Sequence, residues 1–151
     1  MTDRYTANAS AGATTFEFVS EGPKGKVTKI VRYTESHLKG LYNMGFGDKD
    51  ELTNYLSDTS VTNNGDSQKV LATVAATLYV FTDEYPAALI VATGSTEART
   101  RLYRMGIANN LEAIERDFIV LGLTAGEWQP FQRGVTYGAF LVRRKSLSLQ
   151  P

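Results

Sequence analysis

Apolar and polar residues alternate in the first third of the chain, a period of two that is typical of strands with one buried face. The alternation runs over residues 15–20 and 26–33, and the Gly-Pro-Lys-Gly sequence at 22–25 is a turn signal between them. We therefore predict an antiparallel hairpin. Residues 41–47 predict a third strand, which their two glycines would weaken or bend.

The next segment is polar before a long helical pattern begins. Residues 48–58 are acidic and typical of a loop tip, and residues 59–62 predict a short strand. Apolar side chains then recur at helical spacing over 70–81, around most of the helix circumference, so we expect packing on more than one side. Asp66 or Ser67 is the expected N-cap, because a short acceptor side chain satisfies the first free amides.

Longer apolar runs mark the second half of the chain. Residues 88–92 are an unbroken apolar run, which is typical of a strand covered on both faces, and residues 118–123 predict another strand. Residues 126–131 and 135–143 predict a final hairpin around Gly134.

A second helical pattern covers residues 97–105, is interrupted at Gly106 and resumes over 111–116. The order of elements is therefore strands, helix, strand, helix and strands. This order predicts an α+β fold, in which a mainly antiparallel sheet carries two principal helices packed on one face.

Composition and charge fit one soluble domain. The 151 residues are 42% apolar and carry 16 basic and 16 acidic side chains, which excludes a disordered chain and a strongly basic nucleic-acid coat. We expect a flexible lead-in at 1–13, one domain at 14–146 and a tail at 147–151. No apolar stretch is long enough to cross a bilayer and no signal core opens the chain, so we expect a cytoplasmic protein without a membrane partner.

Residue counts also limit the chemistry. The chain has no cysteine, which excludes disulfides, zinc–thiolate sites and thiol nucleophiles. The single histidine, His37, excludes paired-histidine sites and is expected on the surface. Asp48, Asp50 and Glu51 could hold a hard cation, but a solvated loop tip is the simpler interpretation. We therefore expect no cofactor and no metal.

The strongest candidate site is the start of the second helix. Free amides and the helix dipole at such an N-terminus favour an anion, and Gly94 lets the backbone approach a ligand closely. The alternative is a simple helix cap, with arginines that pair with nearby acids. The candidate ligand-binding residues here are Gly94, Ser95, Thr96, Arg99, Arg101, Tyr103 and Arg104.

A second candidate precedes the first helix. Asn63 and Asn64 carry carboxamides that could orient a base edge or a sugar, and Asp66 could act as a base. The alternative is turn chemistry, because asparagine and glycine tolerate positive φ and aspartate caps helices. Four aromatic side chains near the C-terminus could likewise stack bases, although core packing is their more usual role. They are Trp128, Phe131, Tyr137 and Phe140.

Three blocks of the sequence resemble a family of small bacterial single-domain proteins of unknown function. They are FEFVSEGPKGK near the start, SVTNNGD running into KVLATVA, and ATGSTEARTRLYR. The resemblance covers about residues 15–145 and implies a bacterial, single-domain protein. It implies no activity.

Three functions are compatible with these residues. The first is a binding module for a phosphate-bearing ligand, a nucleotide or an RNA end, at the Gly94–Thr96 helix start. The second is a small metal-independent ribonuclease, in which an arginine stabilises the phosphorane charge and Tyr103 or Asp66 handles protons. The third is a protein-interaction module or homodimer.

Overall fold

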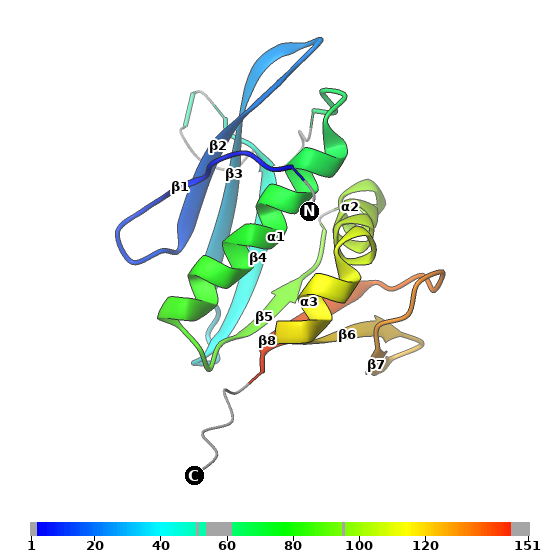
Figure 1. The fold of residues 1–151 in the computed structure, drawn as a ribbon. Helices are drawn as coiled ribbons and strands as arrows, with labels where there is room; N and C mark the ends of the chain where they lie inside the picture. Colours follow the sequence, from blue (N-terminus) through cyan, green and yellow to red (C-terminus); the bar gives the residue numbers. More distant parts are fainter. Residues whose placement is uncertain (1–2, 51, 54–61, 95, 146–151) are drawn as a thin grey trace.

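The computed structural model describes residues 3–50, 52–53, 62–94 and 96–145. Within these ranges it has two layers, an eight-stranded sheet and three helices that lie on one face of it (Figure 1). This architecture confirms the predicted α+β fold. The strands lie in the order β1-β2-β3-β4-β5-β8-β6-β7. The elements are β1 (Asn8–Ala9), β2 (Thr15–Gly22), β3 (Gly25–Glu35), β4 (Leu41–Asp48), α1 (Ser67–Glu84), β5 (Leu89–Ala92), α2 (Glu97–Asn109), α3 (Leu111–Asp117), β6 (Phe118–Thr124), β7 (Glu127–Pro130) and β8 (Ala139–Arg144).

The first three predicted strands are confirmed as β2, β3 and β4. β2 and β3 form an antiparallel hairpin in which Phe16 lies opposite Val31, and β4 pairs antiparallel with β3. The alternation of apolar and polar residues reflects one buried face, as expected, because Phe16, Phe18 and Val31 are buried against the helices. Tyr33 continues this inward row.

Helix α1 is confirmed over the predicted region and lies along the sheet (Figure 1). Phe81 is fully buried and stacks on Tyr33, with ring centroids 4.2 Å apart. Asp66 is the N-cap residue, as predicted, but its side chain makes no cap hydrogen bond, so the expected bond to the first free amides is wrong. The carboxylate instead accepts hydrogen bonds from Tyr5 and Ser20.

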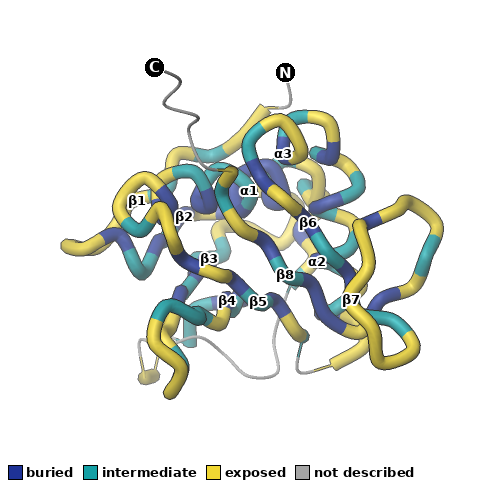
Figure 2. The backbone as a smooth tube through the Cα atoms, turned by 90° about the horizontal axis from the view of Figure 1, so that it is seen from below, coloured by how far each residue is buried: buried dark blue, intermediate teal, exposed yellow. Residues whose placement is uncertain are grey.

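The chain returns through α1 to place β5 parallel to β4, the one parallel pair among the strands described. β5 is a strand, as predicted, but it is covered on one face only. Ile90 and Ala92 are buried beneath the helices, whereas Leu89 on the opposite face is 37% exposed. The expectation of two covered faces is wrong because all three helices lie on the same side (Figures 1 and 2).

Helix α2 runs through Gly106 to Asn109, so the predicted interruption at Gly106 is wrong. A Cβ atom at Gly106 would lie 3.2 Å from Cδ2 of Leu71. The glycine therefore allows α1 and α2 to approach each other, and the break falls at Asn110, before α3. The resumed helical pattern after the break is confirmed.

The predicted C-terminal hairpin is wrong in its pairing. β7 pairs with β6 across a tight turn at Ala125 and Gly126, which both have positive φ. β8 lies between β5 and β6 and is antiparallel to both. Its inward side chains Phe140 and Val142 are buried in the core. The place of β8 in the sheet depends on contacts with strands distant in sequence, which a local pattern does not specify.

The ends and the loop complete the description. Tyr5 stacks on Phe18 and its amide donates to the Thr73 hydroxyl, so part of the segment expected as a lead-in packs on the domain. The short strand expected at 59–62 falls almost wholly outside the described residues. Among the described helices, none has the length and apolar character needed to cross a membrane.

Candidate functional site

A cavity of about 430 Å³ lies between the N-terminal part of α1 and helix α2. Small-molecule pockets commonly have volumes of about 300 to 1,000 Å³, so its size suits a small ligand. It is lined by polar and charged side chains and by an apolar wall. Its described lining residues are Lys29, Phe46, Thr62, Asn63, Asn64, Asp66, Ser67, Val70, Leu71, Thr96, Ala98, Arg99, Arg101, Leu102 and Met105.

The cavity exists because β4 is longer than its partner strand β5. The two strands pair only as far as Met44 and Ala92, after which β5 turns into α2 and β4 continues to Asp48. The backbone amide of Phe46 then donates to the Tyr103 hydroxyl at 3.1 Å instead of to a strand. By fold-level analogy, this place beyond the carboxyl ends of parallel strands is where open α/β sheets bind ligands.

Gly94 makes the sharp turn from β5 into α2. A Cβ atom there would lie 2.3 Å from the backbone nitrogen of Thr100, a distance that real Cβ atoms do not show. The Gly94 amide donates to the Thr100 hydroxyl at 3.1 Å. The close approach predicted for this glycine is therefore made by the protein's own helix.

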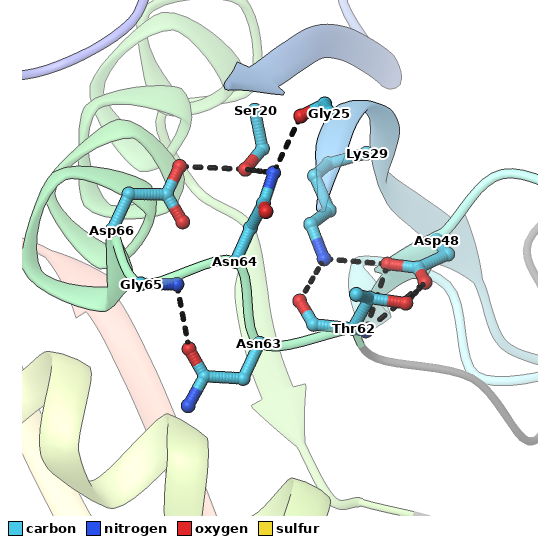
Figure 3. Close-up of polar contacts among 9 residues, drawn as sticks. All are labelled: Ser20, Gly25, Lys29, Asp48, Thr62, Asn63, Asn64, Gly65 and Asp66. Carbon is cyan, nitrogen blue, oxygen red and sulfur yellow. Dashed lines mark hydrogen bonds and ion pairs between the residues drawn. The ribbon is translucent and has the colours of Figure 1, made fainter. Parts of the chain in front are cut away.

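One residue that lines the cavity, Lys29, belongs to a buried ion pair. Lys29 and Asp48 lie opposite each other on β3 and β4, and Nζ of Lys29 is 2.5 Å from Oδ1 of Asp48. The ammonium also donates to the Thr62 carbonyl oxygen at 2.6 Å (Figure 3). The lysine is 1% exposed, so its charge has been taken out of water and depends on these acceptors.

Asp48 is held as a carboxylate by this arrangement. Burial would raise its pKa, but hydrogen bonds from Lys29 and from the hydroxyl and amide of Thr62 outweigh burial and lower the pKa below its ordinary value. The Thr62 hydroxyl donates to Oδ2 at 2.5 Å. The three residues therefore anchor the segment that leads into α1 (Figure 3).

In the Asn63–Asp66 segment, some side chains hold the local structure together and others face the cavity. Asn64 is 2% exposed, and its side chain is engaged by the Lys24 amide, the Gly25 carbonyl oxygen and the Ser20 hydroxyl. Asn63 accepts from the Gly65 amide at 3.0 Å, and in Figure 3 its side-chain nitrogen points away from the ion pair. Asn63 is therefore the better placed of the two carboxamides to meet a ligand.

Asp66 faces the hairpin end of β2. Its Oδ2 accepts from the Tyr5 hydroxyl at 2.5 Å and from the Ser20 hydroxyl at 2.6 Å. Because the Asp66 side chain caps none of the α1 amides, Ser67 brings an uncapped first turn of α1 to the cavity.

On the opposite wall, Thr96 caps α2 by accepting from the Arg99 amide at 3.2 Å, as the capping interpretation predicted. The Arg99 side chain is 7% exposed and lines the cavity, where Arg101 joins it. Arg104 turns away to the Thr136 hydroxyl, 3.4 Å distant, in a separate and more open hollow. Ser95 lies outside the described residues.

Tyr103 belongs to the core instead of the cavity wall. Its side chain is 5% exposed and burial raises the pKa of its hydroxyl. The structure thus brings together Asn63, Asn64 and Asp66 with Thr96, Arg99 and Arg101, and it leaves Gly94, Tyr103 and Arg104 outside this cavity. Phe131, Tyr137 and Phe140 pack on one another in the core, and Trp128 lies on the opposite face of the sheet.

Sequence reasoning missed Lys29 and wrongly placed Asp48 in a solvated loop tip, whereas Asp48 is the buried last residue of β4. The sequence nevertheless carries a signal for both. Lys29 occupies the inward row of β3, between Val27 and Val31. Asp48 follows Phe46 in the inward row of β4. A charged side chain in a row that is otherwise apolar, on each of two neighbouring strands, indicates a buried pair.

Comparison with known proteins gives a family and no activity. No curated protein and no solved structure matches the chain significantly. A family of unknown function, DUF6934, matches residues 1–145 and agrees with the resemblance seen in the three sequence blocks. The chain belongs to this family.

Proposed function

We propose that this protein binds a phosphate-bearing small ligand, a nucleotide or the end of an RNA chain, in the cavity between α1 and α2. One observation carries the proposal. The cavity gathers Asn63 and Ser67 from the start of α1 with Thr96, Arg99 and Arg101 from α2, beside the buried Lys29.

The chemistry of this wall suits an anion with an attached apolar group. Among the described lining side chains, Arg99 and Arg101 are cationic, the charge of Lys29 is matched by Asp48, and Asp66 is the one acidic residue. The first turn of α1 adds backbone amides and the positive end of a helix dipole. The apolar part of the wall would receive a base or similar ring, and its described members are Phe46, Val70, Leu71, Leu102 and Met105.

Arginine variants on one helix test this proposal. Arg101→Ala removes a cation from the cavity, and Arg104→Ala removes one from the same helix outside it. We expect Arg101→Ala to weaken phosphate or mononucleotide binding by about tenfold or more, the usual effect of losing a charge-assisted hydrogen bond. Arg104→Ala should change the affinity less than about twofold, since salt screens a charge that lies outside the site.

The ligands compared should be inorganic phosphate, adenosine and uridine monophosphates, and a short RNA with and without a 5′-phosphate. Calorimetry gives the affinities, and the rise in melting temperature reports binding to the folded state. Equal weakening by both variants would point to general charge attraction. No binding of any of these anions by the unmodified protein would contradict the proposal.

A further inference from the structure

The sheet face opposite the helices carries an apolar surface over its second half. The strand register places two adjoining rows of side chains there. One row is Leu41, Leu89, Arg143 and Ile119. The next is Asn43, Val91, Leu141, Leu121 and Pro130.

Leu123 and Trp128 extend this surface at the β6–β7 end. Leu89, Ile119 and Trp128 are 37%, 38% and 42% exposed, high values for large apolar side chains that share one face of the sheet. Arg143 is the one charged member of these rows among the described residues. We name this surface, defined by the two rows with Leu123 and Trp128, the open apolar face.

The same side of the sheet is different over β2 and β3. There the outward positions carry Glu17, Thr28 and Arg32, and Glu17 pairs with Lys49 at 3.0 Å. Ile30, between Thr28 and Arg32 in the same outward row, is apolar but 1% exposed, and Val19 is an isolated exposed apolar residue. The apolar character therefore belongs to one half of the sheet and is not a general property of this side.

The extent of the open apolar face is enough for a protein contact. β5 and β7 have four residues each, β8 six and β6 seven, and β4 adds the four residues that pair with β5. With strand spacings of about 4.8 Å and a rise of about 3.3 Å per residue, these positions cover roughly 400 Å². Two such faces in contact would cover roughly 800 Å² in total, the size of a weak or transient protein contact. Exposed patches of this size on a monomer are often functional.

We propose that the open apolar face is a homodimer interface, in which a second copy of this chain packs sheet against sheet. A mainly apolar surface with a single charged side chain is complementary to itself, as a two-fold interface requires, and two twisted sheets stack well at a small angle. A two-fold axis along the Val91–Leu141–Leu121 row also keeps the two copies of Arg143 apart. Each arginine then lies over the β8–β7 end of the other copy, where its aliphatic stem and guanidinium can pack on apolar and aromatic side chains.

Sedimentation equilibrium of the full chain tests the dimer. We expect the unmodified protein to show twice its 16.6 kDa mass at about 100 µM, a concentration that populates even micromolar dimers. Ile119→Glu places a charge in the interface and should weaken dimerisation by at least 100-fold. Val19→Glu is the matched control, because Val19 is an equally exposed strand residue at 41% but lies outside the open apolar face.

Circular dichroism must show that both variants keep the fold, and the exposure of the two positions makes that the expected result. If Ile119→Glu unfolds the chain, Leu89→Glu repeats the test at another position of the same face. If the unmodified protein is a monomer, the proposal is overturned. This is the result expected if the face binds a membrane or a different protein. A dimer that survives both Ile119→Glu and Leu89→Glu overturns it too, because the contact would then lie elsewhere.

Discussion

Charged side chains are distributed differently in the two halves of the sheet. In β3 and β4, the inward row that should be apolar contains the buried pair Lys29 and Asp48, and the outward side of β2 and β3 carries the charged residues Glu17 and Arg32. In β5, β8 and β6 the inward side chains are apolar except at the strand ends, where Arg144 packs on Phe118 and pairs with Asp83 of α1 and where Thr124 ends β6, and the outward side is apolar except for Arg143.

Each half therefore departs from the simple rule of apolar inside and polar outside, in opposite directions. Burying an ion pair gives little stability in itself, so its presence beside a cavity suggests chemistry or ligand binding there. Exposing large apolar side chains is unfavourable unless something covers them, so the second half suggests association. The comparison separates the half that carries the proposed ligand site from the half that carries the proposed contact surface.

Breaking the buried pair should have the largest effect. Lys29→Met leaves the Asp48 carboxylate buried without its cation, and we expect a loss of about 3–5 kcal/mol in the free energy of unfolding. Urea denaturation at neutral pH measures this. Lys26→Met, an exposed lysine on the same strand, is the control and should change stability by less than about 0.5 kcal/mol. Equal effects of the two substitutions would show that the pair is not special.

The turn that opens the cavity should tolerate no side chain. Gly94→Ala would push its Cβ against the backbone of α2, and we expect a loss of about 1–3 kcal/mol or more. Gly138→Ala is the control, since a Cβ at that position meets nothing within 4 Å. Thermal or urea unfolding of the two variants should differ clearly, and similar values would contradict the tight strand–helix turn.

The buried pair also predicts an acid-dependent stability. The folded-state pKa of Asp48 is lowered, so its contribution is fully present above the ordinary aspartate pKa of 3.8 and is lost as the pH falls through the lower folded value. Unfolding free energies measured between pH 7 and pH 2 should fall over that acidic range. Asp48→Asn should flatten this fall, and an unchanged pH profile in the variant would show that other carboxylates cause it.

A smaller effect is expected at the edge where β4 extends past β5. Tyr103→Phe removes the hydroxyl that accepts from the Phe46 amide, and leaving that buried amide unpaired should cost about 1–3 kcal/mol, less than the ion pair. The protection of the Phe46 amide against hydrogen exchange should fall in parallel. If its exchange rate does not change, water or another group replaces the hydroxyl.

Much of the fold follows from local patterns, and the failures share one physical cause. The β2–β3 hairpin and α1 follow from periods of two and 3.6, which depend only on the chain itself. The pairing of β7 and the insertion of β8 between β5 and β6 depend on non-local contacts, which local patterns do not encode. The unbroken run at 88–92 predicted cover on both faces, and in the single chain only one face is covered.

The candidate site was predictable in part. The strand–glycine–helix turn and the arginines of α2 were recognised from the sequence, and the cavity brings Arg99 and Arg101 to one wall. The role of Asn64 could not be predicted, because its partners Lys24 and Gly25 come from a distant turn. Arg101, Tyr103 and Arg104 lie on the same helix and differ in the direction in which their side chains point around its axis. Which of them faces the cavity can be predicted only when the position of the helix on the sheet is known.

The most direct test is a set of ¹⁵N amide spectra of one sample, first titrated with inorganic phosphate and a mononucleotide and then diluted without them. The ligand should shift the amides of Asn63, Ser67 and Thr96, around the cavity. Dilution should shift amides of β5, β8 and β6, including Ile119, and leave the cavity unchanged. Ligand shifts that avoid the cavity, or one common set of shifts in both experiments, would contradict the division of the molecule into a ligand-binding half and a contact half.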